Sequence, residues 1–208
     1  MRDAPQWFDP AVVPPRDDYV LVDGGAFDGD TTASFMAAFG GRFGGVYAFE
    51  PDPDLASRAA ARVVADPRVH VFPEGLSDRG SWAAFLATGG TDGRIVEADR
   101  SVGYEQRGCL ESRPWSDDVS VRVASIDERI REPVSLIKLD VEGAELAALR
   151  GAVGHIRSDA PLLAVATYHR ASDMCAIPQY IVAQRGTYRL FLRHYTEVSF
   201  ETVLYAVP

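Results

Sequence analysis

The segment VLVDGGAFDGDT, residues 20–31, contains an apolar run that ends at Asp23 and leads through a glycine-bearing turn into an amphipathic stretch. The apolar run is short and rich in β-branched residues, which is typical of a buried parallel strand. Gly25 and Gly29 allow the backbone of the turn to come close to a ligand at the start of the next helix. The segment therefore predicts the first strand, turn and helix of a nucleotide-binding unit.

A second apolar run, VYAF at residues 46–49, ends at Glu50. This spacing after the first strand is that of an acidic residue which accepts hydrogen bonds from ribose hydroxyls. Ligands of open parallel sheets bind in the crevice outside the carboxyl ends of the strands. We therefore expect Asp23 and Glu50 to face one ligand crevice.

The charge of the first turn discriminates among nucleotide-like ligands. A pyrophosphate requires a GxGxxG turn and an uncharged helix N-terminus, whereas this turn carries Asp28 and Asp30, which repel phosphate. S-adenosylmethionine has no phosphate, and its sulfonium and ammonium groups suit an acidic turn. The sequence thus favours this cofactor over NAD and disfavours an NAD-linked oxidoreductase, while a noncatalytic nucleoside-binding or scaffold protein remains the alternative.

A third stretch, VSLIKLDVEGAE at residues 134–145, again reads as a buried strand that ends in a carboxylate, Asp140. We expect Asp140 to lie at the same edge of the sheet as Asp23. Lys138, two residues before Asp140, lies on the same face of the predicted strand. We expect it to pair with a glutamate, because an unpaired lysine buried in a sheet is costly. Glu142 and Glu145 are predicted to share one face at the start of a helix, where they could also act only as caps.

The rest of the chain shows alternation of strands and helices in a single domain, residues 19–208, preceded by a proline-rich N-terminal arm, residues 1–18, whose aromatics pack against the domain or a neighbouring subunit. An antiparallel excursion is expected near 81–87 and a hairpin at 188–193 and 202–207. The apolar residues of 88–118 follow neither the period of a helix nor that of a strand, and this segment is expected to form a lid or active-site loop. The other predicted strands are 19–23, 45–49, 68–72, 119–123, 134–139 and 161–167, and the predicted helices are 29–39, 53–64, 125–131, 142–151 and 173–184.

Composition limits the function classes. The chain of 208 residues carries a net charge of −9, which argues against nucleic acid or an anionic membrane as partner. Cys109 and Cys175 have neither metal-ligand nor disulfide spacing, and no apolar run reaches the ~18 residues that span a bilayer. These features predict a cytoplasmic protein with two free thiols.

Several segments together resemble the FkbM family of S-adenosylmethionine-dependent methyltransferases. They are VDGGAFDGDT (22–31), AFEPDPD (48–54), GLSD (75–78), IKLDVEGAELAALRGA (137–152), TYHRASDMCAIPQYI (167–181) and YRLFLRHYTEVSFETVLYAV (188–207). The resemblance implies an α/β, Rossmann-like class I methyltransferase fold, with a seven-stranded, mostly parallel sheet and a C-terminal antiparallel hairpin. It implies S-adenosylmethionine as cofactor, with S-adenosylhomocysteine as product. The cofactor contacts are expected from Asp23, Gly25, Ala26, Phe27, Asp28, Gly29, Thr31, Glu50, Pro51, Leu76, Ser77 and Asp140.

By the same resemblance, the acceptor is a hydroxyl of a saccharide or secondary metabolite, although nitrogen and carbon acceptors stay open. Transfer to a hydroxyl requires removal of its proton, and histidine is suited to this near neutral pH. His169 follows a predicted strand directly and His194 follows the first tail strand, whereas His70 and His155 are interpreted as structural.

The candidate catalytic residues are therefore His169, His194 and Asp140, and the candidate acceptor-binding residues are Glu142, Tyr168 and His169. Asp140, His169 and Asp173 could approach one another, but no metal-ligand spacing is evident. A metal is not predicted, although Mg²⁺ could assist. The aromatic arm and the tail hairpin are consistent with a homodimer.

Overall fold

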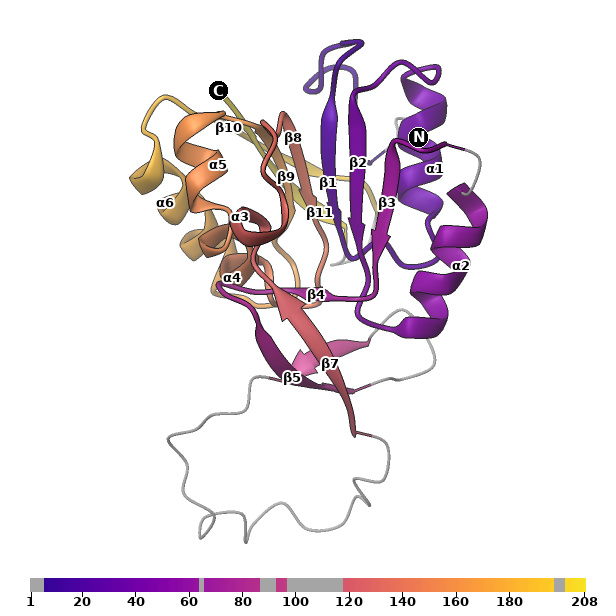
Figure 1. Ribbon diagram of the computed structural model, residues 1–208. Helices are drawn as coiled ribbons and strands as arrows, with labels where there is room; N and C mark the ends of the chain where they lie inside the picture. Colours follow the sequence, from indigo (N-terminus) through magenta and orange to yellow (C-terminus); the bar gives the residue numbers. More distant parts are fainter. Residues whose placement is uncertain (1–5, 64–65, 87–92, 97–117, 197–200) are drawn as a thin grey trace, which may run out of the picture.

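A seven-stranded sheet forms the centre of the fold, in the order β10-β11-β9-β8-β1-β2-β3 (Figure 1). The computed structural model describes residues 6–63, 66–86, 93–96, 118–196 and 201–208. All neighbouring strands of this sheet pair in parallel except β11, which is antiparallel to both β9 and β10. The predicted mostly parallel sheet with its C-terminal hairpin is confirmed. The strands are β1 (Val20–Gly24), β2 (Gly45–Phe49), β3 (Val69–Phe72), β8 (Leu136–Leu139), β9 (Leu162–Ala166), β10 (Arg189–His194) and β11 (Thr202–Val207).

Helices cover both faces of this sheet, because its strands are apolar on both sides. Leu21 packs into the cluster that contains Phe35 of α1, whereas the next residue, Val22, packs into the cluster that contains residues of α4, α5 and α6. Figure 1 shows α1 and α2 on one side of the sheet and the other helices on the opposite side. The helices are α1 (Asp30–Ala38), α2 (Pro53–Val63), α3 (Ile126–Arg129), α4 (Glu145–Arg150), α5 (Val153–Ser158) and α6 (Asp173–Gln184).

The N-terminal arm packs against the face that α1 covers. The ring of Phe8 lies 5.3 Å from the ring of Phe35, measured between centroids, and Val12 and Val13 are buried beside them. The hydroxyl of Tyr19 donates a hydrogen bond of 2.9 Å to the carbonyl of Pro14. The expectation that the arm packs against the domain is thus confirmed for its described residues.

A second, smaller sheet has the strand order β4-β7-β5-β6 and lies at the carboxyl end of the parallel strands (Figure 1). Its strands are β4 (Gly75–Leu76), β5 (Ser81–Leu86), β6 (Arg94–Val96) and β7 (Asp118–Ala124). The expected antiparallel excursion is β5, and it pairs with β7, the predicted strand 119–123. Of the predicted loop 88–118, only 93–96 and 118 belong to the described residues; Cys109 lies outside them, and Cys175 is an exposed free thiol.

The predicted helix 142–151 is wrong at its start. The backbone at Glu142 and Gly143 has φ of 53° and 92°, which is incompatible with an α-helix, and α4 begins only at Glu145. Glu142 and Glu145 therefore do not share a helix face. A further short helix, α5, follows α4 after Ala152 and was not predicted.

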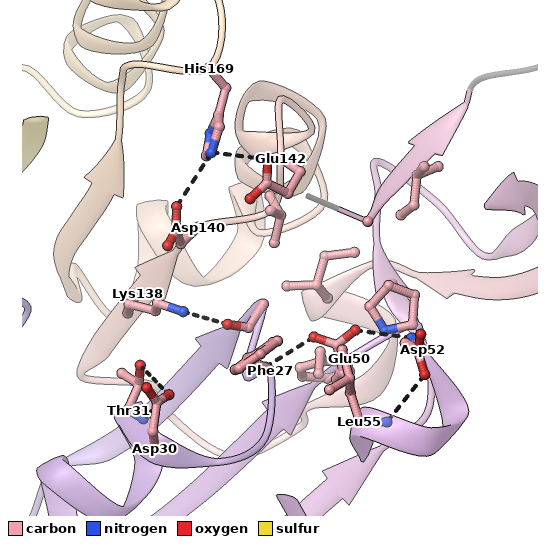
Figure 2. Close-up of a pocket in the computed structure, with 18 of the residues that line it drawn as sticks. Phe27, Asp30, Thr31, Glu50, Asp52, Leu55, Lys138, Asp140, Glu142 and His169 are labelled. Atoms are coloured by element: carbon pink, nitrogen blue, oxygen red, sulfur yellow. Dashed lines mark hydrogen bonds and ion pairs between the residues drawn. The ribbon is translucent and has the colours of Figure 1, made fainter. Parts of the chain in front are cut away.

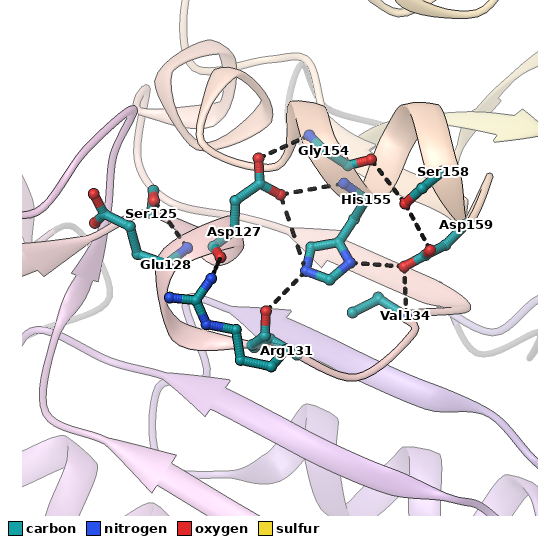
Figure 3. Close-up of polar contacts among 10 residues, drawn as sticks. Ser125, Asp127, Glu128, Arg131, Val134, Gly154, His155, Ser158 and Asp159 are labelled. Atoms are coloured by element: carbon teal, nitrogen blue, oxygen red, sulfur yellow. Dashed lines mark hydrogen bonds and ion pairs between the residues drawn. The ribbon is translucent and has the colours of Figure 1, made fainter.

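His155 joins α5 to two other elements (Figure 3). Its Nδ1 lies 2.7 Å from Asp159 Oδ2, and that same oxygen accepts a hydrogen bond from the backbone N–H of Val134, just before β8. Asp127 of α3 accepts hydrogen bonds from the backbone N–H groups of Gly154 and His155. These contacts confirm the structural interpretation of His155.

No helix among the described residues combines the length and the apolar character needed to cross a membrane.

Lys138 is buried in the middle of the sheet, and its partner is Asp23. The register of β1 and β8 places the two residues opposite each other, and Lys138 Nζ lies 3.0 Å from Asp23 Oδ1. Burial opposes the charge of Lys138, but the carboxylates of Asp23 and Asp140 outweigh it and raise the lysine's pKa. The expected pairing with a glutamate is wrong, because the facing strand supplies an aspartate.

Removing the charge of Lys138 should strongly destabilise the fold. The substitution Lys138→Met leaves Asp23 buried without its cation, which is expected to lower the free energy of unfolding by about 3 kcal/mol. The double variant Asp23→Asn/Lys138→Met should lose less than the sum of the two single variants, because both charges are then absent. Urea denaturation of all four proteins measures this, and strictly additive losses would contradict the ion pair.

Candidate active site

A pocket of about 860 Å³ opens at the carboxyl ends of β1, β2 and β8. Its wall combines the turn after β1, the start of α2, the small sheet, the turn after β8, the residues after β9 and the N-terminal arm. Figure 2 shows the polar groups of this wall and their contacts. Among the residues predicted from the sequence, those in the wall are Gly25, Phe27, Thr31, Glu50, Pro51, Leu76, Asp140, Glu142, Tyr168 and His169.

The turn after β1 packs directly against the end of β8. Gly25 has a φ of +72°, and a Cβ atom on it would lie 1.9 Å from the carbonyl oxygen of Asp140. The backbone N–H groups of Gly25 and Ala26 both donate hydrogen bonds of 3.0 Å to the carbonyl of Phe49. Only glycine fits at this position, and the turn is therefore fixed between β2 and β8.

Other residues predicted for this turn do not reach the pocket. The expectation that the Asp23 side chain faces the crevice is wrong, since Asp23 is fully buried against Lys138 and accepts a hydrogen bond of 2.7 Å from Thr32 Oγ1. Asp28 pairs with Arg62 and does not line the pocket, whereas Asp30 does.

The small residues of the turn have packing roles. Ala26 is fully buried, and a Cβ atom on Gly29 would lie 2.9 Å from the Cα of Ala59 in α2. Ala26 thus packs inside the fold, and Gly29 lets the start of α1 lie close to α2. Neither residue lines the pocket. Ser77 also lies outside the wall, and its backbone N–H donates to the carbonyl of Ala124.

Glu50 follows β2 and presents its carboxylate at the pocket. One carboxylate oxygen accepts a hydrogen bond from the backbone N–H of Phe27 and the other from that of Asp52, each at 3.0 Å (Figure 2). The side chain is nearly buried, and this burial raises the pKa of Glu50 to about 7 against the opposing effect of the two N–H donors. Each oxygen retains a lone pair for a further donor, so the carboxylate can accept two hydroxyl groups.

The opposite wall of the pocket is formed by Asp140, Tyr168 and His169. The hydroxyl of Tyr168 donates a hydrogen bond of 2.9 Å to Asp140 Oδ1. His169 Nε2 lies 3.6 Å from that same oxygen and 3.4 Å from Glu142 Oε2 (Figure 2). The structure therefore brings together all the residues that were predicted for the acceptor side except His194.

Behind the wall, Glu145 fixes the His169 ring. Its Oε1 atom lies 2.8 Å from His169 Nδ1 and also accepts a hydrogen bond from the backbone N–H of Val141. Burial lowers the pKa of His169, but Glu142 and Glu145 outweigh this effect and raise it to about 10. In this arrangement the imidazole is charged at neutral pH.

The structure does not bring His194 into the pocket. It is exposed on β10, and its Nδ1 lies 2.9 Å from Thr202 Oγ1 of the neighbouring strand. Glu201, which precedes that strand, does line the pocket. Both histidines were chosen for their position at a strand end. His169 follows β9 and lines the pocket, whereas His194 is the last residue of β10 and its side chain contacts β11, although Thr196 two residues later does line the pocket.

Sequence reasoning missed the contribution of the N-terminal arm to the pocket. Gln6 and Trp7 line it, and the ring centroid of Trp7 lies 5.3 Å from Lys138 Nζ. The paired aromatics Trp7 and Phe8 were the available signal, but their pattern indicates packing without saying which of them points to a ligand site. Other wall residues that were not predicted include Asp52, Leu55, Phe85, Ile95 and Val141.

Comparisons with known proteins identify relatives of the chain. Its residues 23–195 match the model of the methyltransferase FkbM domain. The chain is 29% identical over 144 residues to the 2-O-methyltransferase NoeI of Sinorhizobium fredii, an alignment that covers 65% of this chain and 58% of NoeI.

Solved structures share the fold of this chain. The methyltransferase FkbM from Methylobacillus flagellatus superposes with a TM-score of 0.70 and 26% identity, over 91% of this chain and 44% of that one. Fibrillarin from Aeropyrum pernix, solved with natively bound S-adenosyl-L-methionine, has a TM-score of 0.51 and 16% identity over 92% of this chain and 67% of its own, and shares the fold. The chain thus spans about half the length of its FkbM-type relatives. With a domain match over most of its length, this chain belongs to the FkbM methyltransferase family.

Proposed function

We propose that the protein transfers a methyl group from S-adenosylmethionine to a hydroxyl group of a saccharide or secondary metabolite. The observation that carries this proposal is the Glu50 carboxylate, which lies in the pocket wall at the end of β2 with lone pairs available for the two ribose hydroxyls. Family membership supports the transfer of a methyl group.

The pocket fits a phosphate-free, cationic nucleoside. Asp30, Glu50 and Asp52 line its cofactor side, and the apolar side chains of Leu55 and Leu76 offer a surface for an adenine ring. Among the described wall residues, the cations are Lys138, which Asp23 neutralises, and His169. A pyrophosphate would therefore meet carboxylates, whereas the sulfonium and ammonium groups of S-adenosylmethionine would meet opposite charge.

The acceptor is proposed to bind at Asp140, Glu142, Tyr168 and His169. When bound, S-adenosylmethionine supplies an electrophilic methyl group, so the protein must align the acceptor oxygen and remove its proton. NoeI is a 2-O-methyltransferase, which supports a hydroxyl acceptor for this chain. The net charge of −9 supports a small molecule or oligosaccharide rather than a nucleic acid.

His169 is the proposed base, with Asp140 beside it. Because the neighbouring carboxylates hold the imidazole in its charged form, Nε2 accepts the hydroxyl proton only after its own proton has left. Asp140, whose oxygen lies 3.6 Å from Nε2 at the pocket wall, is the adjacent group that can accept a proton. Burial raises the pKa of Asp140, against the effects of Lys138 and His169, which favours such an exchange.

Binding of the cofactor should be visible as thermal stabilisation. S-adenosylhomocysteine at about 100 times its Kd should stabilise the fold by about 2.7 kcal/mol. That corresponds to a rise in Tm of roughly 5–10 °C for a chain of this size. NAD at the same concentration should give no rise, and differential scanning fluorimetry measures both. A shift with NAD alone would contradict the proposal, and a shift without any methyl transfer would favour the noncatalytic alternative.

The affinity for S-adenosylhomocysteine should fall with decreasing pH. Ribose hydroxyls donate to the ionised carboxylate, and the raised pKa of Glu50, about 7, means that it is protonated below that pH. The affinity should therefore weaken roughly tenfold for each pH unit below 7. Calorimetric titration from pH 5.5 to 8.5 measures this dependence. The variant Glu50→Gln should bind weakly at every pH, and an unchanged slope in that variant would assign the titration to another group.

Replacement of the two candidate histidines should separate them. His169→Ala should lower kcat by 10²-fold or more, in the range typical of a lost general base. His194→Ala, the matched control outside the pocket, should change kcat less than threefold. Both variants should keep the affinity for S-adenosylhomocysteine. Methyl transfer is measured with S-adenosylmethionine labelled in its methyl group and a panel of hydroxylated acceptors, and equal losses in the two variants would rule out a special role of His169.

A further inference from the structure

We propose that Asp140, Glu145 and His169 bind a divalent metal cation. One donor atom from each side chain lies within 4.8 Å of the donor atoms of the other two. Around an octahedral ion with bonds of roughly 2.1–2.3 Å, donor atoms are about 3 Å apart when adjacent and about 4.4 Å apart when opposite. The three donors thus fit one ion after small side-chain movements.

The three ligands come from separate segments that the sheet brings together. Asp140 follows β8, Glu145 begins α4 and His169 follows β9. β8 and β9 are parallel neighbours, with Leu139 opposite Val165, so both carboxyl ends deliver their residues to one place. A ligand set of this kind has no recurrent spacing in the sequence, which is why a metal was not predicted.

One buried carboxylate oxygen in this cluster lacks a hydrogen-bond partner among the described residues. Glu145 is fully buried, and its Oε2 atom has no hydrogen bond. Such an atom carries a desolvation cost that a bound cation would offset. Beside it, Figure 2 shows His169 Nε2 directed towards Asp140 and Glu142, which it approaches at 3.6 and 3.4 Å without a hydrogen bond of good geometry. The unpaired oxygen of Glu145 is an observation independent of the acidic composition.

The charges of the cluster do not balance. Four carboxylates face His169: Asp140, Glu142 and Glu145 lie within 3.6 Å of its ring nitrogens, and the buried Asp173 of α6 acts on it electrostatically. Of the nearby cations, Lys138 is paired with Asp23. Arg170 lies over Gly143 and partly offsets Asp173. One imidazole and one exposed guanidinium cannot neutralise four carboxylates, and a divalent cation held by the neutral imidazole would bring two positive charges into the cluster.

The donor set favours an ion that prefers oxygen. Two carboxylates and one imidazole, with Glu142 able to add a further oxygen, suit Mn²⁺ or Mg²⁺ better than the thiolate-preferring metals. Asp140, Glu142 and His169 line the pocket, so the ion would be accessible to an acceptor hydroxyl and would lower its pKa, and His169 would then act as a ligand of the ion in place of the base. This last step rests on the proposed methyl transfer; the binding of the ion does not.

The site is tested by titrating the full chain with Mn²⁺, followed by electron paramagnetic resonance, without cofactor or acceptor. We expect one saturable site, from which excess Mg²⁺ displaces Mn²⁺. Asp140→Asn and His169→Ala should each weaken Mn²⁺ binding at least tenfold. Asp30→Asn removes a pocket carboxylate outside the cluster and should leave Mn²⁺ binding unchanged.

Glu145→Gln should also weaken binding, but Glu145 is fully buried, so circular dichroism must first show that this variant folds. If Glu145→Gln does not fold, the variants of Asp140 and His169 decide the question, because these two residues lie at the pocket wall. Absence of saturation at millimolar Mn²⁺, or equal binding by Asp140→Asn, His169→Ala and Asp30→Asn, would overturn the proposal.

A methyl transfer that continues in EDTA would return His169 to the role of an ion-independent base. Because binding of S-adenosylhomocysteine is measured separately, a protein that binds this nucleoside but no Mn²⁺ would refute the metal site and leave the proposed function intact.

Discussion

The buried contact between Lys138 and the first strand is the constraint on which the pocket depends. Lys138 Nζ pairs with Asp23 and also donates hydrogen bonds to the carbonyls of Gly24 and Gly25, at 3.0 and 2.7 Å. Gly24 ends β1 and Gly25 begins the turn that lines the pocket, and the contact therefore fixes the start of this turn to β8. A hydrophobic residue at position 138 could fill the same volume, but it could not hold the polar backbone of the turn.

The two carboxylates that end β2 and β8 perform different tasks because their surroundings differ. Glu50 accepts a backbone N–H group on each oxygen, which suits it to the role proposed for it as an acceptor of hydroxyl hydrogen bonds. Asp140 instead lies between Lys138, Tyr168 and His169, within a concentration of charge. The same strand-end geometry thus produces a carboxylate held by backbone donors at β2 and a carboxylate among charged side chains at β8. The proposed sites for the ribose and for the reaction therefore lie apart along one edge of the sheet.

The fold and half of the pocket could be predicted from local sequence patterns. Apolar runs that end in Asp23, Glu50 and Asp140 located three adjacent strands, because strand period and the crevice rule are local in the chain. The orientation of Asp23 could not be predicted, since it depends on the register between β1 and β8. Glu142 was misplaced because its positive φ, a conformation uncommon for a non-glycine residue, has no signal at that position in the sequence. Trp7 was missed because it meets the other residues of the pocket through contacts between segments far apart in the sequence.

The position of Glu145 shows why capping and function need not be alternatives. Its Oε1 atom accepts hydrogen bonds from the backbone N–H groups of Val141 and Gly143, which fixes the turn before α4, and the same atom contacts His169 Nδ1. A carboxylate held by two backbone donors cannot rotate away from the imidazole, so the ring orientation is inherited from the backbone. Nε2 is thereby kept at the pocket side, whatever group it meets there. A residue that a sequence pattern assigns to a helix start is thus also the group that orients the site.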